Sequence, residues 1–263
     1  MLCKWILMTL LLSTALGESC FLAEVDPVAD PTDADAAAFM VEVIRDEPES
    51  LEIEKSVLIY HTHTYEAYEQ VQNDTYVQTE KWRTMDETHN VIAVGKALTA
   101  SLRALGVNVT HDTTAFEPPE LSTAYDRSLN MLKTRIAAGE QYDLYIDLHR
   151  DALASASSIK RTVNIGGEEV ARFMVLVGKG TTGGYDEKPD WNTNLIIAQG
   201  ITNRLNKQCN QLARDVKIKT GRFNQHVSNA CILIECGMNY NTLNEVLAGI
   251  PYLAEAIVQT LTE

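Results

Sequence analysis

The sequence predicts an α/β fold, arranged as a single three-layer domain with a mainly parallel sheet. Short apolar runs alternate with helical segments from residue 51 to the end of the chain, and this alternation is typical of parallel sheets covered by helices. The chain has 263 residues, of which 45% are apolar and 22% charged, with 14 glycines and 7 prolines. That composition is globular and excludes fibrous or low-complexity proteins.

The expected elements follow from local pattern. Residues 56–60 form an apolar run that predicts a buried strand. Residues 90–105 carry apolar side chains at a helical period and end before Gly106, a common helix terminator. Thr242 and Glu245 have the spacing of a capping box, which opens the final helix. The other expected strands are 107–109, 143–148, 173–177 and 231–234, and the other expected helices are 125–138 and 195–205.

The charge distribution separates a leader from the body. The net charge is −14, and residues 1–54 hold two basic and twelve acidic side chains, so they contribute −10. The remaining residues carry 20 basic and 24 acidic groups. A nucleic-acid-binding protein is expected to show the opposite sign, so we expect no nucleic-acid partner.

Three segments are expected along the chain. Residues 1–17 have a short basic start, an apolar run and a small-residue end, which indicate a signal peptide, with an uncleaved anchor as the alternative. Residues 18–50 are rich in Asp, Glu, Ala and Pro and predict a disordered acidic linker. Residues 51–263 form the catalytic domain. We therefore expect an extracytoplasmic protein, secreted or tethered to the outer face of the membrane by its N-terminus. We also expect the four cysteines beyond the signal segment to be free thiols, because Cys231 and Cys236 would point to opposite faces of one strand.

Groups suited to metal chemistry follow three of the predicted strands. His61 and His63 follow the first strand, His149 ends another, and Glu235 ends the last. The carboxyl ends of parallel strands meet at one edge of a sheet, where functional groups gather. Two histidines and a carboxylate can hold zinc and leave a fourth position open for water. A nearby glutamate can then take a proton from that water and pass it to the leaving amine. A carboxylate directly after apolar strand residues is costly to bury unless it is paired or faces a metal.

Five stretches with these residues resemble a known family, stage II sporulation protein P, an N-acetylmuramoyl-L-alanine amidase of sporulating bacteria. The stretches are IYHTHTYEAY (59–68), WRTMDETHNVIAVGKAL (82–98), AYDRSL (124–129), DLHRDA (147–152) and RFNQHVSNACILIECGMNYNT (222–242). The resemblance implies a zinc hydrolase with the fold of the cell-wall amidases and zinc carboxypeptidases. Its expected reaction is cleavage of the amide between N-acetylmuramic acid and L-alanine in peptidoglycan, linked to wall remodelling in sporulation.

The resemblance also implies residue roles. His63 and His149 match metal ligands, and Glu235 matches the catalytic acid and base. The third ligand is expected to be Glu66, three residues after His63, with Asp86 or Glu87 as alternatives. His61 would support the ligands from beside them.

Arg150 is a candidate to stabilise the oxyanion or to bind a stem-peptide carboxylate, and its alternative is an ion pair with Asp147 or Asp151. The alternatives for the whole protein are a zinc peptidase that cuts stem-peptide cross-links, and an inactive wall-binding module. The expected partners are peptidoglycan and a glycan-cleaving protein resembling stage II sporulation protein D, and we expect a monomer.

Overall fold

The computed structural model describes residues 53–155 and 159–263. The predicted signal segment and acidic linker lie outside these ranges. Within them, no helix is both long enough and apolar enough to cross a membrane. The elements are β1 (Ile53–Tyr60), α1 (Val91–Ala104), β2 (Val107–His111), α2 (Ala124–Ala137), β3 (Leu144–Asp151), β4 (Thr162–Ile165), β5 (Glu168–Ala171), β6 (Phe173–Gly178), α3 (Trp191–Gln208), β7 (Lys217–Lys219), β8 (Cys231–Met238), α4 (Leu243–Leu247) and α5 (Ile250–Leu261), with short 3-10 turns at Leu121–Thr123 and Gln225–Val227.

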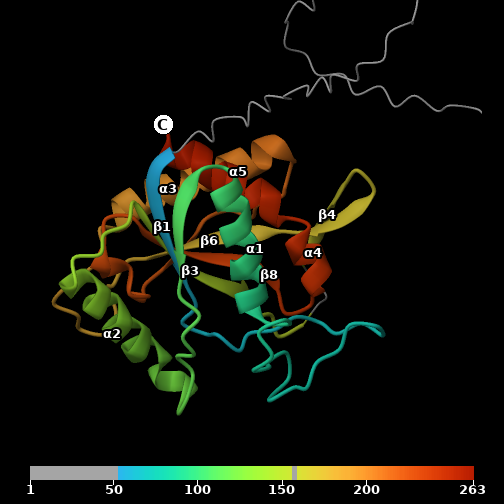
Figure 1. Cartoon of the computed structure of the whole chain (residues 1–263), viewed down its shortest axis with the longest axis horizontal. Coiled ribbons are helices and arrows are strands. Elements are labelled where there is room, and N and C mark those ends of the chain that lie inside the picture. Colours follow the sequence, from blue (N-terminus) through green and yellow to red (C-terminus); the bar gives the residue numbers. More distant parts are fainter. Residues whose placement is uncertain (1–52, 156–158) are drawn as a thin grey trace, which may run out of the picture. The chain divides into compact units, whose positions relative to one another are not determined.

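The main sheet confirms the predicted class. Its strand order is β2-β1-β3-β8-β6-β7, and every neighbouring pair is parallel except β6 and β8 (Figure 1). The carboxyl ends of β1, β3 and β8 therefore lie at the same edge. A separate hairpin of β4 and β5 was not predicted; it turns through Gly166 and Gly167, both with positive φ, as tight hairpins require.

Side chains alternate between two cores because successive strand residues face opposite sides of the sheet. Leu58, Tyr60 and Tyr145 pack with Leu132 of α2. Their neighbours in sequence pack on the other face in a larger core that includes side chains of α1, α3, α4 and α5. The helices thus form two outer layers, with α2 apart from the other helices (Figure 1).

The C-terminal segment confirms the capping box but not a single final helix. Thr242 accepts from the backbone N–H of Glu245, whose carboxylate accepts in return from the Thr242 backbone. The helix that starts there ends at Leu247, and α5 begins at Ile250 with proline in its first turn. Proline cannot continue a preceding helix because it lacks the N–H and clashes with the previous turn.

The cysteines of the described residues are free, as expected. Cys209 is partly exposed, and Cys231 and Cys236 are buried in β8. Cys231 belongs to the core beneath α2 and Cys236 to the opposite core, so their side chains point to different faces of the strand.

Candidate functional site

The site begins on β3 and β8. Asp147 and His149 are two residues apart, so they share the sheet face that also carries Tyr145 beneath α2. His149 pairs in register with Glu235 of β8. Both are nearly enclosed, with 3% of His149 and 8% of Glu235 exposed. The strand register therefore places a histidine beside a glutamate at the carboxyl edge of the sheet.

The segment after β1 brings His63 and Glu66 to the same place. The ring of His63 meets that of His149 edge-on, with centroids 5.3 Å apart and planes at 87°. Glu66 Oε2 lies 3.3 Å from His149 Nδ1 and accepts a hydrogen bond of 3.1 Å from the backbone N–H of Arg150. Four of the predicted site residues, His63, Glu66, His149 and Glu235, are thus neighbours in the fold.

Burial and charge shift the pKa values within this cluster in opposite directions. Burial, reinforced by the negative charge of Glu66, raises the pKa of Glu235 to about 8. Burial also acts to raise the pKa of Glu66, but the hydrogen bond and charge of His149 outweigh it and hold that pKa at about 2. Burial and the charge of His149 lower the pKa of His63 to about 4. The cluster therefore contains one carboxyl group that favours the ionised state and one that retains a proton.

Three polar atoms in the cluster are buried without a hydrogen-bond partner: His63 Nδ1, His149 Nε2 and Glu235 Oε2. Unpartnered buried polar atoms are rare in proteins and frequently mark a missing ion or a catalytic role. Within the described residues, no group of three or more His, Cys, Asp or Glu side chains forms a ready metal site. Two observations nevertheless fit zinc. His63 has a free nitrogen, and His149 Nδ1 and Glu66 Oε2 have the separation of about 3.3 Å expected for two tetrahedral ligands of one zinc ion.

Asp147 anchors this cluster and was not predicted as part of it. Its Oδ1 lies 2.8 Å from His149 Nε2, although the direction of that contact does not make a hydrogen bond. The carboxylate accepts from the backbone N–H of Thr62 at 2.8 Å and from its hydroxyl at 2.7 Å. The Thr62 hydroxyl also contacts Ser128 Oγ of α2 at 2.9 Å. The spacing of Asp147 and His149 along one strand was the signal available in the sequence.

The alternative carboxylates have other partners. Asp86 accepts from Thr88 and contacts His89 Nδ1 at 2.8 Å, while Glu87 pairs with Lys96 at 3.0 Å. Both carboxylates lie in exposed contacts at the start of α1.

His61 was expected to support the metal ligands from beside them, but residues 62–65 form a turn after it instead of continuing the strand. His61 Nδ1 donates to the carbonyl of Leu148 at 2.9 Å, and its Nε2 lies 2.8 Å from His111 Nε2. The His61 ring therefore packs between the backbone of β3 and Gly95 of α1, where a Cβ atom would lie 2.6 Å from its Nε2.

Arg150 is buried and its guanidinium is engaged by backbone. It donates to the carbonyl oxygens of Ala67 at 2.7 Å, Trp82 at 3.0 Å and Asp151 at 3.3 Å. The ion pairs suggested with Asp147 and Asp151 do not occur among the described residues, where Asp147 contacts His149 and Asp151 pairs with Arg214. Arg150 thereby ties the loop after Glu66 to β3.

Two aromatic residues beside His63 were also not predicted. Tyr125, near the start of α2, meets the His63 ring edge-on at 5.4 Å, and Phe223 meets Tyr125 at 5.9 Å. No spacing in the sequence connects them, although both lie in stretches that resemble the family.

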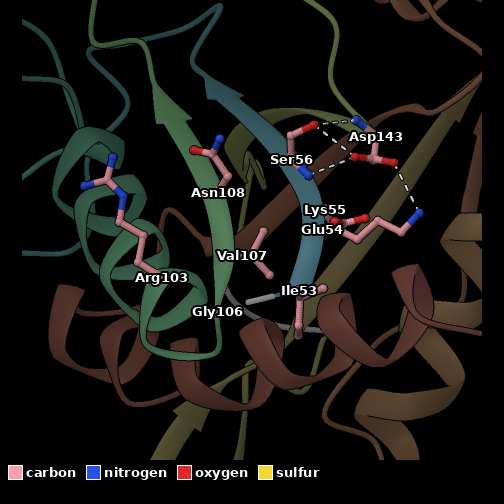
Figure 2. A pocket seen from close by; sticks show the side chains of 9 residues that line it. All are labelled: Ile53, Glu54, Lys55, Ser56, Arg103, Gly106, Val107, Asn108 and Asp143. Atoms are coloured by element: carbon pink, nitrogen blue, oxygen red, sulfur yellow. Dashed lines mark hydrogen bonds and ion pairs between the residues drawn. The ribbon is translucent and has the colours of Figure 1, made fainter. Parts of the chain in front are cut away.

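A pocket of about 580 Å³ lies elsewhere, around the start of β1 (Figure 2). Its walls include Ser56 and Asp143, whose side chains bond to each other, and Lys55 pairs with the same aspartate. This is the amino edge of β1, so the pocket is separate from the cluster at the carboxyl edge.

Comparisons with solved structures define the class. The CwlD amidase of Clostridioides difficile, solved with the GerS lipoprotein, superposes with a TM-score of 0.50, is 15% identical, and the match covers 79% of this chain and 98% of that one. An N-acetylmuramoyl-L-alanine amidase from Clostridium difficile 630 gives 0.48 with 14% identity, covering 79% and 95%. The likeness to CwlD shows that the chain has the α/β fold of that amidase.

The sequence comparisons give the family. The pattern of the family described as Stage II sporulation protein P (SpoIIP) matches residues 26–258, and the chain belongs to this family. Stage II sporulation protein P of Bacillus subtilis (strain 168) is 26% identical over 203 residues, which are 73% of this chain and 47% of that protein. The chain thus aligns with about half the length of this relative.

Proposed function

We propose that the protein is a zinc-dependent peptidoglycan amidase that hydrolyses the bond between the lactyl group of N-acetylmuramic acid and L-alanine. The observation that carries the proposal is the buried cluster of His63, Glu66, His149 and Glu235 at the carboxyl edge of the sheet. Membership of the family and the amidase fold support it. Glu235 is buried, has a raised pKa, lies beside His149 and has one carboxylate oxygen without a hydrogen-bond partner, and such groups are typical of active sites.

The metal ligands in this proposal are His63, His149 and Glu66. Zinc bound by these residues would act as a Lewis acid, which could polarise the amide carbonyl and lower the pKa of bound water. Glu66 is preferred to Asp86 and Glu87 because its carboxylate contacts His149, whereas theirs are engaged at the start of α1.

Glu235 moves the proton. Its carboxylate accepts a proton from the attacking water and delivers it to the nitrogen of L-alanine as the amide breaks. The raised pKa of Glu235 suits both steps, because a group that titrates near neutral pH can accept and release a proton. Asp147 orients the His149 ring, as carboxylates commonly do for metal-binding histidines. Arg150 holds Glu66 through its backbone N–H.

The setting of this activity is part of the same proposal. Residues 51–263 form the catalytic domain, and the protein acts as a monomer outside the cytoplasm, on the wall that is remodelled during sporulation. A glycan-cleaving partner resembling stage II sporulation protein D would release the products.

The test is a digestion of purified peptidoglycan by the full chain, with products identified by mass spectrometry. We expect free stem peptides that begin with L-alanine, loss of cleavage in a chelator, and recovery with added zinc. The chain with Asp86→Asn should behave as the unsubstituted protein. Products cut only at cross-links would replace the amidase proposal with a peptidase, and walls that are bound but never cut would indicate a binding module.

A further inference from the structure

An unusual turn borders the cluster. Phe223 and Asn224 are successive residues with left-handed φ angles of 50° and 55°. A residue with a Cβ atom adopts this conformation only where its surroundings fix it. Here the Asn224 side chain donates to the carbonyl of Tyr125 at 2.8 Å and to Ser128 Oγ at 3.0 Å. The next side chain, Gln225, bridges the backbone of β6 with bonds of 2.8 and 2.9 Å. The turn is thus held from both sides.

The turn fixes the ring of Phe223 in a slot lined by two glycines. A Cβ atom at Gly178 would lie 2.7 Å from the ring, and one at Gly221 would lie 2.8 Å from it. Both separations are shorter than real Cβ contacts, so only glycine allows this packing. Strained backbone that is braced in this way frequently serves a functional site.

The Phe223 ring is linked to the proposed active site through Tyr125. It meets Tyr125 at 5.9 Å, and Tyr125 meets His63 at 5.4 Å. We call Tyr125 and Phe223 the aromatic wall. It runs from one of the proposed metal ligands to the segment that contains Lys219 and Arg222.

Lys219 lies at the far end of the aromatic wall, and Arg222 directly precedes Phe223 in the chain. Lys219 Nζ lies 6.0 Å from the centre of the Phe223 ring. The Arg222 guanidinium lies 3.9 Å from the centre of the Tyr185 ring. Arg222 also donates to the carbonyl of Glu187 at 3.4 Å. Within the described residues neither cation has an ion pair with a carboxylate, in a protein whose net charge is −14.

We propose that Lys219 and Arg222 form a subsite that binds a free carboxylate of the stem peptide next to the scissile amide. The inference rests on the proposed amidase function. The residue after L-alanine in a stem peptide is acidic and carries a free carboxylate unless it is amidated. Unpaired cations beside an aromatic wall suit this ligand, because the wall packs against the peptide chain while the cations form charge-assisted hydrogen bonds. The subsite would make the enzyme prefer the acidic form of the peptide.

The test measures binding in the full chain with Glu235→Gln, so that the ligand is not consumed. The probes are two soluble muramoyl peptides that differ only in whether the second residue is D-glutamate or its amide. We expect Lys219→Gln and Arg222→Gln each to raise the Kd of the acidic peptide about tenfold and to leave that of the amidated peptide within twofold. Lys219→Arg should restore binding. The control is Lys207→Gln, which removes the same charge from exposed α3 on the other face of the sheet.

Each other result overturns the inference. Equal Kd values for the two peptides, or an equal loss of affinity for both peptides in the variants, mean that the cations do not bind the carboxylate. Failure of the amidase proposal is distinguishable, because the protein with Glu235 intact would then release no L-alanine peptides while the binding preference persisted.

Discussion

Replacement of Glu235 by glutamine should stabilise the metal-free protein and abolish its activity. The side chain is 8% exposed, its Oε2 has no hydrogen-bond partner, and its pKa is raised from 4.5 to about 8. At pH 7 the folded state therefore keeps this proton while the unfolded chain loses it, and this difference destabilises the folded state by roughly 3 kcal/mol. Glutamine has nearly the same shape and carries no charge, so that cost disappears.

The raised pKa of Glu235 determines how the free energy of unfolding changes with pH. Below pH 4.5 Glu235 is protonated in both states and contributes no difference. Between pH 4.5 and about 8 the unfolded chain loses this proton first, so the free energy of unfolding falls as the pH rises. The difference between Glu235→Gln and the unsubstituted protein should therefore be near zero at pH 4 and grow to roughly 3 kcal/mol at pH 7.

The assay is urea unfolding of the full chain in a chelator across this pH range. Exposed Glu168 supplies the matched control, and Glu168→Gln should change the free energy of unfolding by less than about 0.5 kcal/mol. With zinc restored, Glu235→Gln should lose about 10²–10⁴-fold in rate while its zinc content stays normal. If Glu235→Gln were no more stable at pH 7 than the unsubstituted protein, the carboxyl group of Glu235 would not be buried without a compensating partner. Loss of zinc would make Glu235 a ligand, and an unchanged rate would remove it from catalysis.

Three further predictions follow from the same geometry. His149→Ala and Glu66→Gln should each lose zinc on dialysis, because two remaining ligands hold it poorly; elemental analysis that finds a full zinc content would contradict the assignment. Asp112→Asn should reduce the loss of stability in acid, because Arg135 and local hydrogen bonds hold the pKa of Asp112 below its usual value despite its burial. The stability that ionised Asp112 adds is present above its unfolded-state pKa and is lost as the pH falls through its folded-state pKa. An unchanged acid midpoint in pH-dependent unfolding would contradict this prediction. A chain that begins at Leu51 should fold and cleave peptidoglycan as the full chain does, and insolubility of that shorter chain would contradict the linker interpretation.

The parts of the fold that sequence predicts are those with strong local patterns. The helix over 91–104 was predicted within one residue at each end because its apolar side chains recur at the helical period. Strand β7 was missed because its three residues, Lys217–Lys219, are all exposed and carry no apolar run. The reversed direction of β6 was also missed, since alternating strands and helices do not encode the direction of an individual strand. Pro251 was a visible signal for the break between α4 and α5.

The candidate site divides in the same way. His63, His149 and Glu235 could be found because each follows an apolar run, and parallel strands bring such positions to one edge. Glu66 required knowledge of the turn after β1, and spacing alone left Asp86 and Glu87 open. Tyr125 and Phe223 depend on how α2 and the left-handed turn pack against each other, which is a tertiary property.

The central claim is that the protein hydrolyses the muramoyl–L-alanine amide, and the position of oxygen from water tests it most directly. Peptidoglycan digested by the full chain in water enriched in ¹⁸O should yield N-acetylmuramic acid with one ¹⁸O atom in its lactyl carboxylate, together with unlabelled peptides that begin with a free L-alanine amine. Label confined to a carboxylate of the stem peptide would place the cut in a cross-link and contradict the account.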